Sequence, residues 1–536
     1  MKSKIRLSPF FLLTVFPAIL FLTGCSAYRM TTSANREVYQ ILKNKSQKIT
    51  KQKINWNIKY RPRKAASIKN HPLTLKDTLI LARENNRDYQ TRKETVYLNA
   101  LNLTAQRYLY RVHYNLGGSL TGKKGSNGEN TLSGNLNLNL IKWLAQGAKI
   151  TLGLSENMFQ YLTGSREKAY QSIINLNILQ PLFNGAGRRI AQEDLTQAER
   201  GVVYEIRSFL RYQQSFSVAV SKKYFSLLEA KSSVENYWDN YQFLKKIRLR
   251  IEMLTQAGRI PFLQLGQAKQ DEFGAYLSWL KENNAYRKQL NNFKIFLGLS
   301  PQANLSLKEK GITGYLKKGM PQVKISLGKS LKLSLRKRLD LMTSSDEVGD
   351  AERKVNFALN ALKVKMNINL NAESATKSGG TPSFDFQNPS YQAGLNFKFP
   401  FNNIPGRNTY IEAVINLAKQ KRTLTLKKDD IKLEVINSYH NLQSFYQTYI
   451  MQKKSLELAE SRVESTNLLL QAGRATTRDV LEAQESYLLA KNSLYQAMVN
   501  YLISYLNFLE NTGSLKLNEK GVWKGDLYEK ITGKTG

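Results

Sequence analysis

The tetrapeptide Gln-Ala-Gly-Arg occurs at Gln256–Arg259 and again at Gln471–Arg474, 215 positions later in the chain. The match extends downstream to Gly298 and Gly513, which are separated by the same interval. Each copy lies between two long segments with helical periodicity, and glycine ends a helix at little cost because it accepts left-handed backbone. The period is too long for a solenoid, so we interpret it as the duplicated half of one domain, with a sharp turn between helices in each copy.

Two apolar lines run through the long segment that precedes the first turn, from about Gly187 to Leu254. One line recurs every seven residues, interrupted at Lys223, and consists of Leu195, Val202, Phe209, Phe216, Ala230, Tyr237, Leu244 and Ile251. Two such lines kept over many heptads indicate coiled-coil packing. At 1.5 Å per residue the helix would be roughly 100 Å long, which suits the crossing of a periplasm better than a globular domain.

Six stretches of the chain alternate apolar and polar residues with the two-residue period of a β-strand. They are Tyr110–Leu116, 135–140, 149–154 and 174–178 in the first half, and 363–370 and Tyr391–Phe399 in the second. The additional pair around 134–155 is interpreted as an insertion in one copy. A sheet with one apolar and one wet face fits a soluble sandwich or an outer-membrane barrel. Six strands are too few to close a pore, so a pore requires several chains to share one barrel.

The N-terminus has the features of an export signal. Three basic residues before position 7 precede the apolar run Pro9–Leu22, and Leu22-Thr23-Gly24-Cys25 follows. Cys25 is the only cysteine, which excludes a disulfide within the chain. The residues before it resemble the lipobox of bacterial lipoproteins, in which this cysteine is lipidated, and Ser26 resembles an outer-membrane address. The alternative is an ordinary signal peptide with an incidental cysteine.

The chain is strongly basic, with a formal net charge of +39. Such a balance raises nucleic acid or an anionic membrane as partner, and the export signal argues against nucleic acid. The charge is explained either by a basic solvated surface or by attraction to anionic lipid head groups and envelope polymers. No phosphate-binding loop, nucleophile elbow or zinc-ligand spacing is present, so we predict no enzyme activity, no cofactor and no metal.

The order of elements behind the lipobox resembles that of the TolC-like outer-membrane efflux channel family between about Thr74 and Gly513. The most specific piece is Gly473–Gln484, which is similar to the family's Gly-x-x-Thr-x-x-Asp-Val-Leu-x-Ala turn. The first copy, Gly258–Ala268, matches it more loosely. The resemblance implies an α+β membrane protein, in which long coiled-coil hairpins form a periplasmic tunnel and strands contribute to a shared trimeric outer-membrane β-barrel. In the simplest members each chain supplies four strands, so the number that enters this barrel stays open.

The resemblance also implies the assembly and its location. The chain would form a homotrimer, lipid-anchored in the outer membrane of a diderm bacterium. A periplasmic adaptor protein and an inner-membrane pump of RND or ABC type would complete a conduit for efflux or type I secretion. The alternative function is a non-conducting coiled-coil lipoprotein that braces the envelope, although a brace has no use for strands with one amide-rich face.

Site residues follow from the same resemblance. The adaptor-docking turns are expected at Gly258, Arg259, Gly473 and Arg474. Asp479 and Glu482 lie three apart at a helix start and therefore on one face. They either complement the helix dipole or form threefold acidic rings that favour cations and hold a periplasmic gate closed. Gln264 stands where the second copy has Asp479, so gating is expected at the second turn alone.

These observations divide the chain into six parts. They are a lipoprotein signal peptide at 1–24, a tether at 25–73, a first repeat at 74–299 with strands at about 110–180, a connector at 300–330, a second repeat at 331–513 with strands at about 363–399, and a tail at 514–536.

Overall fold

The computed structural model describes residues 27–50, 54–58, 72–124, 129–163, 169–308, 320, 325–376, 389–519 and 521–523. The expected signal peptide and Cys25 lie outside these ranges. The described residues fall into two compact units. The first draws on Met1–Asn57, Val96–Val203 and Val364–Phe399, and the second on Ile58–Thr95, Tyr204–Lys363 and Pro400–Gly536. Each unit therefore takes residues from both copies of the repeat.

The two halves of the chain repeat one order of helices. The first half contains α3 (Leu75–Asn85), α4 (Arg87–Tyr108), α6 (Glu193–Gln256) and α7 (Phe262–Phe296), and the second contains α9 (Leu327–Lys337), α10 (Leu339–Ala361), α11 (Ile404–Gln471) and α12 (Thr477–Asn511). Their lengths match pair by pair, at 11 and 11, 22 and 23, 64 and 68, and 35 and 35 residues. This agreement supports the internal duplication that the repeated turn predicts. The short helix α5 (Arg188–Ala191) precedes α6.

Each repeat opens with a helix that is broken after eleven residues. The breaks fall at Asn86 and Arg338, which share an extended backbone with φ of −63° and −70°. Neither break contains glycine or proline, so no local signal marks it. Tertiary contacts hold the break instead, since the amide Nδ2 of Asn86 donates to the carbonyl of Phe296 at 2.7 Å. The first of these helices, α3, begins after Thr74, which forms a capping box with Asp77.

A helix that the sequence analysis missed occupies part of the expected tether. Helix α2 (Ala27–Ile49) belongs to the first unit and buries Val38, Ile41 and Leu42. The ammonium of Lys45 pairs with Glu199 at 2.5 Å. Only this short central group of apolar residues is buried, which explains why the periodicity of the whole segment is weak.

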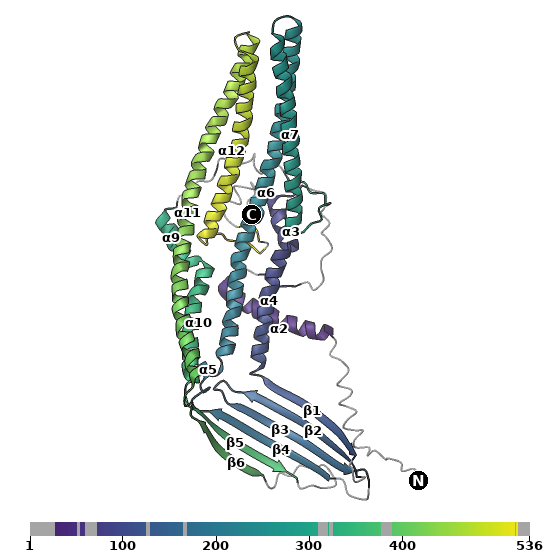
Figure 1. Ribbon diagram of the computed structural model, residues 1–536, viewed down its shortest axis with the longest axis vertical. Helices are drawn as coiled ribbons and strands as arrows, with labels where there is room; N and C mark the ends of the chain where they lie inside the picture. The colour runs from purple at the N-terminus through teal and green to yellow at the C-terminus, as the bar shows by residue number, and fades with distance from the viewer. Residues whose placement is uncertain are drawn as a thin grey trace, which may run out of the picture. The chain divides into compact units, whose positions relative to one another are not determined.

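The first unit contains the predicted strands in a single antiparallel sheet. These are β1 (Val112–Lys124), β2 (Asn130–Trp143), β3 (Lys149–Tyr161), β4 (Ala169–Pro181), β5 (Lys365–Ala375) and β6 (Ser390–Lys398). Their order in space is their order in the chain, so the additional pair, β2 and β3, lies inside the sheet rather than at its edge (Figure 1). All six strand predictions are confirmed.

The register sorts the side chains of the sheet onto two unlike faces. Asn115 lies opposite Asn139, and Asn177 lies opposite Asn371, so amides gather on one face. The other face is apolar along a continuous line through Leu116, Leu138, Leu154 and Ile174. The amide face is hollowed by a depression of about 420 Å³, most of whose lining residues belong to that face, among them Ser119, Ser133, Asn135, Asn157 and Gln171. The polar side is therefore the concave side of this part of the sheet.

In the second unit, α11 packs lengthwise against α12 and α10 (Figure 1). The buried contacts of α11 come from Ile431, Val435 and Leu442, which lie at helical spacing on one face. None of the helices within the described ranges combines the length and the apolarity that crossing a membrane requires.

Candidate functional site

The two repeated turns have the same backbone geometry. Gly258 and Gly473 have φ of 70° and 72°, the left-handed conformation that glycine accepts. The amide of Arg259 donates to the carbonyl of Leu254 at 2.9 Å, and that of Arg474 donates to Leu469 at 2.8 Å. This six-to-one bond is the Schellman closure of a helix end. Both turns are exposed, and a Cβ added at either glycine would meet no atom within 4 Å.

The helices that follow the turns begin differently. Helix α12 starts with a capping box, in which Asp479 Oδ2 accepts bonds from the amide and the hydroxyl of Thr476 at 2.8 and 2.7 Å. These bonds hold the pKa of the exposed Asp479 carboxyl below its ordinary value. Helix α7 starts at Pro261 with no side-chain cap. Within one chain Asp479 thus does what the capping interpretation expects, and its part in a threefold ring stays a prediction.

Glu482 is also engaged within its own helix. Its Oε1 pairs with Arg478 Nε at 2.8 Å, one helical turn away. Both side chains are largely exposed, so this pair contributes little to stability. The structure brings Asp479 and Glu482 to the same helix start, while the two repeated turns lie on separate hairpins and Cys25 lies outside the described residues.

A contact that the sequence analysis missed joins the two hairpins behind their turns. The hydroxyl of Thr477 donates to Gln264 Oε1 at 2.8 Å, and Thr477 is buried. Beside this bond, one apolar cluster is shared by three helices and contains Leu244, Ile247 and Ile251 of α6, Leu265, Ala268 and Ala275 of α7, and Val480 and Leu481 of α12. In the sequence, the one sign of this contact is that Gln264 stands where the second copy has Asp479. Gln264 bonds to the other hairpin, whereas Asp479 caps its own helix.

Further from the turns, a groove of about 420 Å³ lies between α6, α11 and α12. Its rim carries Asp239, Glu460 and Glu464 against a single cation, Lys491. Amide pairs tie α6 to α12 here, since Gln484 Nε2 donates to Asn240 Oδ1 at 3.1 Å and Asn236 Nδ2 to Asn492 Oδ1 at 2.7 Å. Burial, together with Glu460 and Asp239, raises the pKa of the lining Tyr487. In a chain of net charge +39 this groove is a local acidic surface.

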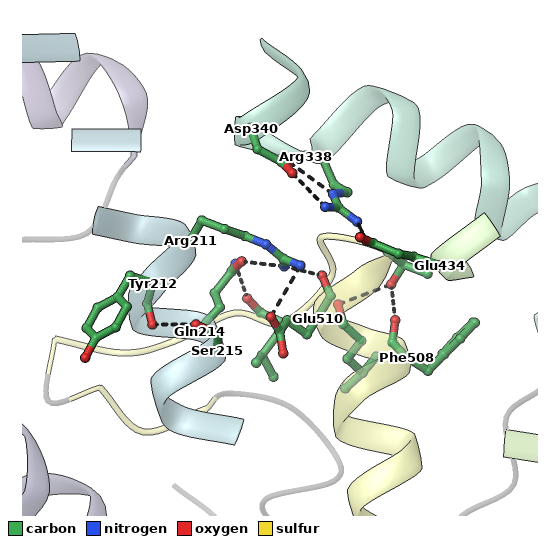
Figure 2. Close-up of polar contacts among 12 residues, drawn as sticks. Arg211, Tyr212, Gln214, Ser215, Arg338, Asp340, Glu434, Phe508 and Glu510 are labelled. Atoms are coloured by element: carbon green, nitrogen blue, oxygen red, sulfur yellow. Dashed lines mark hydrogen bonds and ion pairs between the residues drawn. The ribbon is translucent and has the colours of Figure 1, made fainter. Parts of the chain in front are cut away.

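A buried ionic cluster stands at the break of the second repeat, and Figure 2 shows how its groups converge. Arg338 is 3% exposed, and its guanidinium binds both oxygens of Asp340, at 3.0 and 2.6 Å, as well as Glu434 of α11. Lys427 Nζ also reaches Asp340 Oδ2 at 3.0 Å. Burial alone would raise the pKa of Asp340, but the bonds from Arg338 and Lys427 outweigh it and hold the pKa well below its ordinary value.

Beside this cluster, Arg211 of α6 reaches the end of α12. Its guanidinium donates to the backbone carbonyl of Glu510 at 2.6 Å and lies 3.3 Å from the Glu510 carboxylate (Figure 2). Burial raises the pKa of Glu510, and the nearby arginines partly offset that effect. The first repeat is thus bound to the second by a charge-assisted bond to a carbonyl at the end of α12, which also accepts a bond from the amide of Gly513 at 3.0 Å.

Residues 331–514 match the family model described as outer membrane efflux protein. No curated protein matches the chain. Among solved structures, the chain is similar to CusC, described as forming a transmembrane channel, with 15% identity, a TM-score of 0.62 and coverage of 86% of this chain and 98% of that one. It is similar to the outer-membrane channel OprN at 14% identity, TM-score 0.61 and coverage of 85% and 98%. It is also similar to the outer-membrane channel CmeC of Campylobacter jejuni at 14% identity, TM-score 0.58 and coverage of 89% and 98%. The second repeat therefore matches the outer membrane efflux protein family in sequence, and the chain as a whole has the fold of the TolC-like outer-membrane channels.

Proposed function

We propose that this protein is the outer-membrane channel of a tripartite efflux or type I secretion system. It would act as a homotrimer and provide a passive conduit to the exterior for cargo delivered by a periplasmic adaptor and an inner-membrane pump. The observation that carries the proposal is the six-stranded sheet, whose concave face is rich in amides and whose other face is apolar and exposed.

The exposed apolar face supports a lipid environment. Large apolar side chains project from five of its strands with 38–63% of their surface exposed, namely Leu116, Leu136, Leu176, Leu370 and Leu395. A contiguous apolar surface of this kind on a soluble protein promotes association. In a barrel wall it faces hydrocarbon, while the amide face lines water.

The helical hairpins support the adaptor contact. The turns at Gly258, Arg259, Gly473 and Arg474 are exposed, and the acidic groove below them offers charge complementarity to a basic helical partner. Asp479 and Glu482 would form the acidic gate next to the second turn. Asp479 accepts both capping bonds from Thr476 through Oδ2. The same carboxylate can therefore cap the helix and also contribute its charge to a ring.

We also propose that Cys25 carries the lipid anchor. Helix α2 begins two residues later and packs against the first unit, which holds the sheet. A lipid at Cys25 would thus be tied closely to the membrane-embedded part. A Cys25→Ser variant is expected to lose incorporation of a radiolabelled fatty acid, and retention of the label would contradict the anchor.

Single-channel recording in planar bilayers tests the channel function. The purified trimer is expected to conduct ions, and neutralising both Asp479 and Glu482 is expected to increase the open probability because the ion pairs that would hold the gate closed are lost. A folded trimer that passes no current, even with both acids neutralised, would favour the non-conducting brace.

The same recordings test whether the two turns differ. Asp479→Ala is expected to change the open probability and the cation selectivity, since it removes the carboxylate from the proposed ring. Gln264→Ala is the comparison at the equivalent position of the first copy: it removes no charge but takes away the acceptor of the Thr477 hydroxyl, so it is expected to leave cation selectivity unchanged. Equal effects of the two substitutions would show that the gate is not confined to the second turn.

A further inference from the structure

We propose that all six strands of each chain enter the barrel wall, so that three chains close an 18-stranded barrel whose width is set by the β2–β3 hairpin. The seams would pair β6 of one copy with β1 of the next. This inference rests on the proposed trimeric channel. Beyond that function, it specifies the number of strands in the barrel, the size of the pore, and the β2–β3 hairpin as the element that determines both.

The pairing pattern places the hairpin inside the wall. Strand β1 pairs with β2 from Val112 to Lys124, and β3 pairs with β4 over eleven residue pairs. Within the described residues β1 reaches the rest of the sheet only through β2 and β3. The hairpin therefore cannot stand outside a wall that includes both β1 and β4. A four-stranded contribution that leaves out β2 and β3 would require β1 and β4 to pair directly.

The stagger of the strands matches that of a closed barrel. Directly paired residues can be followed across the sheet from the first residue of β1, in the order Val112, Lys142, Ile150, Ile178, Leu370 and Ala393. This line ends five residues before Lys398, the last residue of β6. If the strand ends that join helices lie in one plane, these five residues, at about 3.3 Å each, are the displacement accumulated over five strand spacings of about 4.8 Å. This displacement corresponds to a strand tilt of roughly 35°. Closed barrels have strand tilts of ~35–45°.

The edges of the sheet require a partner, and an even strand number makes a second copy suitable. Strands β1 and β6 run in opposite directions because five antiparallel pairings separate them. The β1 of a neighbouring chain therefore continues the antiparallel order at β6. An open edge is not tolerated in hydrocarbon, and about eight strands are needed before a barrel encloses even its own side chains. One chain with six strands in its sheet cannot satisfy its edges alone.

The strand number sets the pore size. With a spacing of about 4.8 Å and a tilt of roughly 35°, 18 strands give a backbone diameter of ~34 Å and 12 strands give ~22 Å. Side chains on the inner face take ~5 Å from each side, which leaves free diameters of ~24 and ~12 Å. The wider lumen is an aqueous channel of the size class of 16–18-stranded porins.

Deleting residues 129–163 removes β2 and β3 and joins β1 to β4. The pairing line sets Val112 against Ile178, so direct pairing keeps apolar residues of both strands on one face.

Neutral polyethylene glycols added from the exterior side report the width of the barrel mouth, because polymers that enter lower the current. Polymers of ~15–20 Å diameter are expected to enter the parent channel and to be excluded from the deletion variant. A control that shortens only the β5–β6 connection, residues 377–388, keeps six strands and is expected to admit them.

The outcomes separate this inference from the proposed function. A parent channel that conducts and excludes these polymers, or a deletion variant that admits them, overturns the 18-stranded barrel and leaves the channel function standing. Absence of current in the parent protein overturns the function itself.

Cysteine pairs in the full-length trimer test the wall independently of whether the deletion variant folds. Leu116→Cys with Leu138→Cys joins the opposite residues of β1 and β2, and oxidation is expected to give a disulfide within the chain. Leu116→Cys with Ile174→Cys joins β1 to β4 and is expected to stay reduced, because two strands separate these positions. Efficient formation of the second disulfide would show that the hairpin leaves the wall.

Discussion

Replacing Gly298 with alanine is expected to cost at least ~3 kcal/mol of the free energy of unfolding, the largest effect of any glycine at a helix turn. Gly298 follows α7 with φ of 73°, and an added Cβ would lie 2.2 Å from the backbone oxygen of Asn85. Asn85 ends α3, immediately before the break at Asn86 that is bonded to the end of α7. The clash is with backbone, so no side-chain rotation relieves it.

Gly258→Ala is the matched control for this prediction. Gly258 has nearly the same φ, 70°, but open space around its would-be Cβ. Its replacement adds only the left-handed strain, about 1 kcal/mol. Denaturant unfolding of the purified protein, followed by tryptophan fluorescence, is expected to show a clearly larger loss for Gly298→Ala. Equal losses would mean that the approach of the α3–α4 break to α7 is looser than the structure indicates.

Arg338→Ala is expected to cost ~2–4 kcal/mol, because Glu434 loses its buried cation and Asp340 keeps only Lys427. Removing one partner from a buried ion pair exposes the full desolvation cost of the other. Arg336→Ala provides the control, since that arginine lies two residues earlier and is exposed. A loss of less than about 1 kcal/mol for Arg338→Ala, similar to that expected for an exposed arginine, would contradict the network in Figure 2.

The pH dependence of stability gives a second signature of this cluster. The folded-state pKa of Asp340 is depressed, so its contribution is fully present above the ordinary aspartate pKa of about 3.9 and is lost as the pH falls through and below that value. Without Arg338 only Lys427 still opposes burial, so the pKa of Asp340 rises back toward its ordinary value. Unfolding measured between pH 3 and 6 is therefore expected to show a steeper acid loss in the parent protein than in Arg338→Ala. Parallel pH profiles would assign the acid sensitivity to other carboxylates.

The duplicated architecture explains why these two sites carry the largest effects. Gly298 and Gly513 follow the returning helices of the two repeats, and each lies against the break that opens its own repeat, next to Asn85 in one case and Lys337 in the other. The first break is held by a neutral amide at Asn86 and the second by the ionic cluster of Arg338. The two copies thus stabilise the same helix break with different interactions, a neutral hydrogen bond in the first and ion pairs in the second.

Local patterns in the sequence determined the elements whose cause is local. Strict alternation identified six strands because one face of each is apolar, and the glycines at Gly258 and Gly473 marked the turns because left-handed backbone requires them. The capping box of Thr74 and Asp77 is local in the same way, since capping acts within one helical turn.

Contacts between distant segments decided the rest, and no short window of sequence contains them. The breaks at Asn86 and Arg338 depend on partners far along the chain, and α2 is held by a few buried residues against other elements. Likewise, alternation predicted that β2 and β3 exist, but only strand pairing placed them in the middle of the sheet. Periodicity reports which side of a strand is wet, whereas the neighbours of a strand are chosen by hydrogen bonds and packing across the whole sheet.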